Sequence, residues 1–175
     1  MSVLKKILIS IGVIVLLIVG LIVYNRYQAS VGLKEAYRKE DRVKILSYLM
    51  TDRYEETIKK AGFTIPPRQD LKLDDTLESI EIGKEIPIKI PTVDESSNDF
   101  DILFTSVVDG KKIRVIYTLN SKLELTSEGY YAYWNEETKR TEDVTISKEE
   151  ESRLLGIVQS ELRDFFDKME KSLYG

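Results

Sequence analysis

The first stretch of the chain is uniformly apolar. Residues 7–24 carry no charge, and their only polar side chains are Ser10 and Tyr24. At about 1.5 Å per residue a helix of this length reaches roughly 27 Å, close to the hydrocarbon thickness of a bilayer. A lone helix satisfies its own backbone hydrogen bonds in lipid. The pattern therefore predicts a transmembrane helix at residues 7–24.

The residues around this span favour an uncleaved anchor. A cleaved signal peptide has a shorter apolar core and ends at a small-x-small site, and Tyr27 occupies the upstream position of such a site here. A helix buried in a soluble protein seldom runs this far without a charge. We therefore expect a signal anchor at residues 1–25 and a single domain at residues 26–175.

The charges that flank the span bear on its orientation. Lys5 and Lys6 precede it, and more cations follow, at Arg26, Lys34, Arg38, Lys39, Arg42 and Lys44. A simple count of cations would place the domain in the cytoplasm, but the rule loses force where a whole domain is translocated. A short leader with two lysines is the usual start of an anchor with its N-terminus inside. We expect an extracytoplasmic domain on a single-pass anchor in the cell membrane.

Helical periodicity marks both ends of the domain. Apolar residues recur at three- and four-residue steps over residues 30–61, and the pair Asp52 and Glu55 predicts a break near Thr51. Ser147 and Glu150 form a capping box before a final helix. That helix carries a broad apolar stripe made of Leu154, Leu155, Val158, Leu162, Phe165, Phe166, Met169 and Leu173.

Alternation of period two fills the region between these helices. Short alternating runs predict strands at residues 76–82, 85–90, 100–108, 112–119, 122–126, 130–134 and 140–146. Asp109-Gly110 suits a tight hairpin turn, while Pro87 predicts an edge strand and residues 91–98 an exposed loop. The fold class is therefore α+β: a transmembrane helix, a helix, an antiparallel meander of about six strands, and a C-terminal amphipathic helix packed on the sheet.

The amino-acid composition lacks the residue types that most enzymes use for catalysis. The chain has neither histidine nor cysteine, so the commonest general base and the thiol nucleophile are absent. Asp94 begins a stretch that resembles a calcium loop, but Asp99 replaces its glycine and Thr105 its bidentate glutamate. The nine glycines form no phosphate-binding loop, and a net charge of −4 argues against nucleic acid. We expect a binding protein, not an enzyme, with no catalytic residue, metal or cofactor.

Recognition of another protein is the remaining function. One face of the sheet packs on the final helix, and the other meets water, a second helix or a partner. A mixture of aromatic, aliphatic and arginine side chains on an open face is typical of protein interfaces. The sequence predicts that this face and its acidic surroundings bind a basic site of a protein partner through Leu103, Arg114, Ile116, Tyr131, Tyr133, Glu136 and Glu137.

The order of these elements resembles a known family. A leader with Lys5 and Lys6, one anchor, a charged helix, a meander with the stretch Gly129-Tyr130-Tyr131 and a final helix, all without cysteine, is similar to the TipC-type immunity proteins of Gram-positive bacteria. The resemblance implies a domain outside the membrane that binds and occludes a secreted antibacterial toxin. Two alternatives stay open: an accessory or regulatory subunit of a cell-envelope complex, and a hydrolase that uses paired carboxylates.

Overall fold

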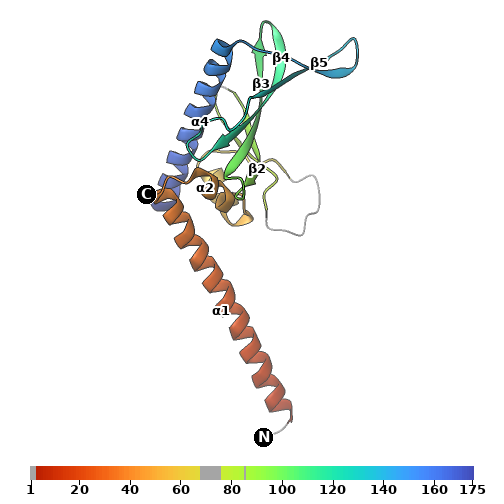
Figure 1. The fold of residues 1–175 in the computed structure, drawn as a ribbon. Coiled ribbons are helices and arrows are strands. Elements are labelled where there is room, and N and C mark those ends of the chain that lie inside the picture. The colour runs from red at the N-terminus through yellow and green to blue at the C-terminus, as the bar shows by residue number, and fades with distance from the viewer. Residues whose placement is uncertain (1–2, 68–75, 85) are drawn as a thin grey trace.

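Helix α1 (Val3–Arg38) extends away from the rest of the molecule. The computed structural model describes residues 3–67, 76–84 and 86–175, and α1 leaves the domain as one unbroken helix (Figure 1). Its apolar side chains from Ile11 to Val31 are exposed, and the helix is long and apolar enough to cross a membrane. The predicted anchor and the start of the predicted second helix therefore form one continuous element.

Three short helical segments follow α1. They are α2 (Arg42–Leu49), η1 (Asp52–Tyr54) and α3 (Glu55–Lys60). The predicted break near Thr51 is confirmed, although Thr51 and not Asp52 occupies the N-cap and its side chain makes no capping hydrogen bond. A second break, which the sequence pattern did not predict, separates α1 from α2 where Glu40 adopts a φ of 53°. Asp41 then caps α2 by accepting a hydrogen bond from the Lys44 N–H at 3.1 Å.

Within the described residues, six antiparallel strands form one sheet in chain order, which confirms the predicted meander. The bounds are β1 (Ile80–Ile82), β2 (Ile88–Asp94), β3 (Asp99–Val108), β4 (Lys111–Asn120), β5 (Tyr130–Asn135) and β6 (Arg140–Asp143). Asp109 and Gly110 turn β3 into β4 with φ angles of 49° and 76°, as their sequence predicts. Because every strand pairs with its chain neighbour, β1 and β6 are the two edges.

Two details of the predicted sheet are wrong. Strand β2 is not an edge, because it pairs with both β1 and β3. Pro87 lies before its first residue, and Pro91, expected in a loop, lies within the strand where the register with β3 shifts between Lys89 and Thr92. The predicted strand at residues 122–126 is reduced to a single antiparallel bridge, between Leu125 and Leu119 of β4. Leu123 there adopts a φ of 66°, which strand geometry does not allow.

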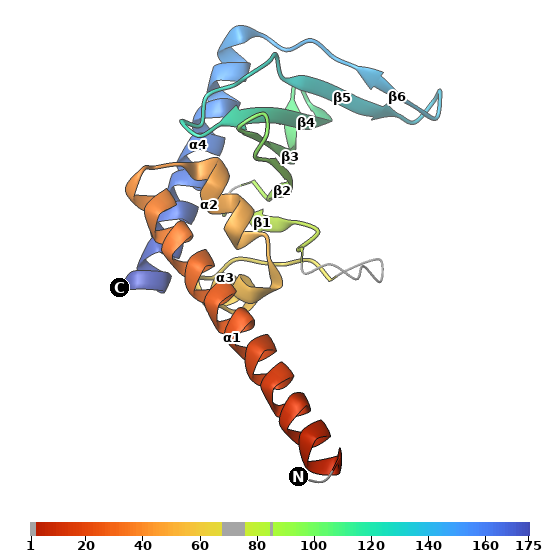
Figure 2. The same ribbon diagram turned by 60° about the horizontal axis from the view of Figure 1, so that its bottom comes forward.

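Helix α4 (Lys148–Tyr174) crosses one face of the sheet (Figures 1 and 2). Ser147 caps it by accepting a hydrogen bond from the Glu150 N–H at 3.1 Å, as predicted. The apolar stripe of α4, the buried face of α2 and the inward side chains of the strands form one core. Phe165 of α4, for example, lies 4.8 Å from the ring of Phe63. The predicted packing of the final helix on the sheet is confirmed.

The two ends of the domain differ in what they carry. At one end the C-terminus of α4 meets the end of α1, where the rings of Tyr37 and Tyr174 lie 5.9 Å apart. The β5–β6 hairpin lies at the opposite end, far from the exposed half of α1 (Figures 1 and 2). If α1 crosses a membrane, this hairpin lies at the end of the domain that is far from it.

Candidate functional site

The face of the sheet turned away from α4 and α2 presents its side chains to solvent. Strand register places Leu103 beside Ile116, and Val107 beside Lys112. Val107 is 62% exposed, and Leu103 and Ile116 are half-buried. We refer to this surface of β2–β5 as the open face.

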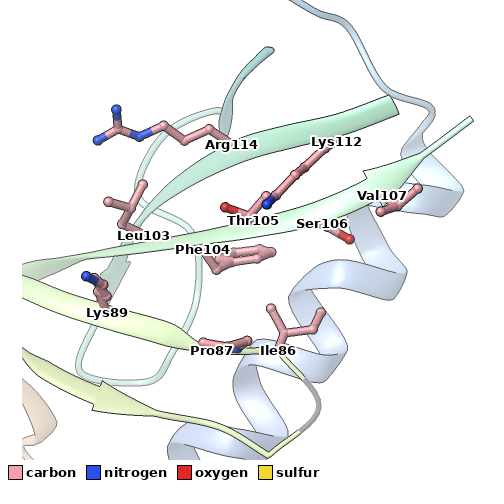
Figure 3. A pocket seen from close by; sticks show the side chains of 10 residues that line it. All are labelled: Ile86, Pro87, Lys89, Leu103, Phe104, Thr105, Ser106, Val107, Lys112 and Arg114. Atoms are coloured by element: carbon pink, nitrogen blue, oxygen red, sulfur yellow. The ribbon is translucent and has the colours of Figure 1, made fainter. Parts of the chain in front are cut away.

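A groove lies beside β3, between the start of β2 and β4, and residues from both faces of β3 line it (Figure 3). It has a volume of about 590 Å³ and is lined by Ile86, Pro87, Lys89, Leu103, Phe104, Thr105, Ser106, Val107, Lys112 and Arg114. Alternation along β3 and β4 brings Leu103, Val107 and Arg114 to this side, since consecutive strand residues point to opposite faces. Two of the predicted binding residues, Leu103 and Arg114, therefore lie in one groove, and Ile116 lies next to Leu103 in the register.

Positive charge borders this groove. Lys112 and Arg114 are exposed and form no ion pair with any other described residue, whereas Lys89 pairs with Glu81 at 2.9 Å. The sequence predicted acidic surroundings for this surface, and the groove itself has the opposite charge. The groove is positive because Lys89 of β2 and Lys112 and Arg114 of β4 lie on the same side of the sheet. The acidic stretch around residue 95 lies in a turn and does not line the groove.

Tyr131 does not lie on the open face, so its predicted placement is wrong. It pairs with Val115, is only 8% exposed, and faces α4. Its hydroxyl donates a hydrogen bond of 2.5 Å to the Glu151 carboxylate of α4. Burial, and next this hydrogen bond, raise the pKa of Tyr131 above its usual value, because both disfavour the phenolate. The residue fastens the sheet to the helix.

Tyr133 lies on the same side as Tyr131, so its predicted placement is also wrong. It pairs with Ile113 and is half-buried. Its hydroxyl donates to Glu142 at 2.6 Å, a bond that raises the pKa of Tyr133, and the Lys111 ammonium lies 4.8 Å from its ring centroid. The bond to Glu142 joins β5 to β6, and the contact with Lys111 joins β5 to β4.

Two aromatic residues that the sequence did not predict occupy the open face instead. Tyr130 pairs with Ile116, and Trp134 shares its parity on β5; they are 44% and 54% exposed. The alternation within β5 already separates Tyr130 and Trp134 from Tyr131. Which pair faces outward depends on how β5 pairs with β4 across the long connection at residues 121–129, and the sequence pattern contains no signal for that pairing.

The two predicted carboxylates lie at the tip of the β5–β6 hairpin, not beside the groove. Glu136 pairs with Lys139 at 2.8 Å, and the Glu137 N–H donates to the Asn135 side-chain oxygen at 2.9 Å. Both side chains are exposed. A partner that approaches from the hairpin end would meet both of them.

Acidic side chains do not gather into a metal site in the part of the chain that the structure describes. No group of three Asp or Glu residues there could hold a metal ion. The open face itself offers aliphatic, aromatic and cationic groups, which suit binding by contact and charge. Comparisons with known proteins add no assignment: no family model, no curated protein and no solved structure matches this chain.

Proposed function

We propose that this protein is a membrane-anchored binding protein that holds a protein partner on the open face of its sheet. One observation carries the proposal: a sheet surface that no described helix covers combines exposed Trp134 and Val107 with the cations Lys112 and Arg114. Exposed tryptophan and arginine are the residues that contribute most to protein interfaces.

The charge of the groove favours an acidic docking segment on the partner. Two unpaired cations beside an apolar strip attract carboxylates at a distance and then gain apolar contact. A partner with a basic site would meet repulsion there. We therefore propose an acidic partner site in place of the basic site expected from the sequence. The affinity for such a partner should fall as salt is added, because salt screens exposed charges.

Anchoring by α1 fits a partner that arrives at the membrane surface. We propose that the domain lies outside the membrane and that the partner is a secreted antibacterial toxin, as the resemblance to TipC-type immunity proteins implies. Neutralisation would then require only that the open face covers the toxin's functional surface. This explains why a chain without histidine or cysteine could protect a cell.

The experiment is a survival assay with matched charge reversals. Cells produce the full chain together with the secreted toxin encoded nearest to its gene. Lys112→Glu with Arg114→Glu reverses charge on the open face, and Arg163→Glu with Lys171→Glu reverses charge at exposed positions of α4. We expect the wild type and the α4 variant to protect, and the open-face variant to fail at equal membrane abundance.

Two results would contradict this proposal. Protection by the open-face variant would show that the open face is not the binding surface. Failure of the wild type to protect would remove the immunity function, and recovery of an envelope protein from detergent-solubilised membranes by wild type, but not by the open-face variant, would favour an accessory subunit.

A further inference from the structure

The continuity of α1 determines which residues lie at the membrane surface. The apolar run ends at Tyr24, and the helix continues without a break to Arg38. Residues 25–29 rise roughly 6–7 Å at 1.5 Å per residue. The headgroup layer on each side of the hydrocarbon is about 5–8 Å thick. If α1 crosses the membrane, these residues therefore lie within the headgroup layer.

Tyrosine side chains mark the same level. Tyr24 and Tyr27 are both exposed on α1; Tyr24 directly precedes this short segment and Tyr27 lies within it. Tyrosine is enriched at membrane–water interfaces because its ring is apolar and its hydroxyl is polar. Their position agrees with the depth derived from the length of the helix.

The folded domain returns to α1 at this level and leaves a cleft. Asn25, Arg26 and Ala29 of α1 line it from one side, and the η1 turn lines it from the other through Thr51, Asp52 and Arg53. Its volume is about 710 Å³. We call this the interfacial cleft.

Two arginines give the interfacial cleft its chemistry. Arg26 and Arg53 are exposed, and neither forms an ion pair with a carboxylate of the described residues. The Arg53 guanidinium lies 5.3 Å from the ring centroid of Tyr54, which restricts its position. A guanidinium presents a planar fork of donors that matches phosphate oxygens. Among the described lining residues, Arg26, Arg53 and Asp52 together carry one net positive charge, which suits a single phosphodiester better than a multivalent anion.

We propose that the interfacial cleft binds the phosphate of an anionic phospholipid between Arg26 and Arg53. The two arginines come from separate elements, so a bound headgroup joins α1 to the η1 turn. This would hold the domain at a constant tilt on the membrane and keep the β5–β6 hairpin at a constant distance from it. The inference requires that α1 spans the membrane and is independent of which protein the open face binds.

Native mass spectrometry of the full chain in detergent tests this site. The protein is incubated with an equal mixture of phosphatidylglycerol and phosphatidylcholine, and the retained lipid is identified on each protein molecule. We expect retention of phosphatidylglycerol over phosphatidylcholine. Arg26→Gln and Arg53→Gln should each lower it roughly fivefold, the factor that corresponds to about 1 kcal/mol for a cation near an anionic lipid.

A matched variant separates the cleft from general charge. Lys122→Gln with Arg140→Gln removes two exposed cations remote from the exposed half of α1 and should retain lipid as the wild type does. Arg53→Gln is decisive, since Arg26 alone could attract lipid from any transmembrane helix. Unchanged retention in Arg53→Gln, equal loss in the control variant, or no preference in the wild type would each overturn the proposal.

Discussion

The two faces of the sheet are formed by the same strands, but one face is buried under helices and the other is exposed. On β3, Ile102 is fully buried beneath the helices while its neighbour Leu103 lies in the open groove. On β5, Tyr131 bonds to α4 while Tyr130 and Trp134 remain exposed. Both faces carry aliphatic and aromatic residues, so hydrophobicity alone does not distinguish them. The described helices determine which face is buried, because they cover only one of the two.

The largest expected effect is a difference in stability between substitutions on the buried face and on the open face. Ile102→Ala removes a fully buried side chain and should lower the free energy of unfolding by about 2–5 kcal/mol, through lost burial and the cavity left behind. Val107→Ala, on the open side of the same strand, should change it by less than about 0.5 kcal/mol. Chemical denaturation of the full chain in detergent measures both. Equal losses would show that the open face is covered in solution.

The next effect separates the faces by binding. Trp134→Ala should weaken association with the partner by at least about tenfold without changing stability, because an exposed tryptophan contributes strongly when an interface covers it. Titration of the purified partner measures the affinity. Trp134→Phe keeps an aromatic ring and should retain most of it. An affinity that survives Trp134→Ala would place the binding surface elsewhere.

The smallest effect concerns the bond between the sheet and α4. Tyr131→Phe loses the hydrogen bond to Glu151 and should cost about 0.5–1.5 kcal/mol at neutral pH. Because folding raises the pKa of Tyr131 above its unfolded value near 10.0, its contribution is complete below that pH and is lost as pH rises further. The variant should therefore lose stability less steeply than wild type above about pH 10. Parallel pH curves would contradict this role.

Local signals predicted much of the fold. The charge-free run marks the apolar part of α1, Asp109-Gly110 marks the β3–β4 turn, and Ser147 marks the start of α4. Each depends on residues adjacent in the chain, so its physical cause can be read in the sequence. The prediction of an edge strand from Pro87 was wrong because the position of the strand was wrong. A proline limits strand pairing only where it lies inside the strand, and β2 begins at Ile88, one residue after Pro87.

The candidate site was only partly predictable. Leu103, Arg114 and Ile116 could be assigned to one face, because β3 and β4 are joined by a tight turn that fixes their register. Tyr131 and Tyr133 could not, because the long connection before β5 leaves its parity undetermined. The charge of the groove also escaped prediction, since it depends on which side chains of three strands come together.

The sequence by itself determined that the chain carries an apolar helix able to cross a membrane, that an α+β meander follows, and that imidazole and thiol chemistry are absent. Only the tertiary structure decided which face α4 covers, that Trp134 rather than Tyr131 faces outward, and that the η1 turn meets α1 beside Arg26. The physical reason is the sequence separation of the interacting residues. Helix propensity, turns and apolar runs depend on residues close together in the chain, whereas the exposed faces, grooves and clefts form where distant segments pack.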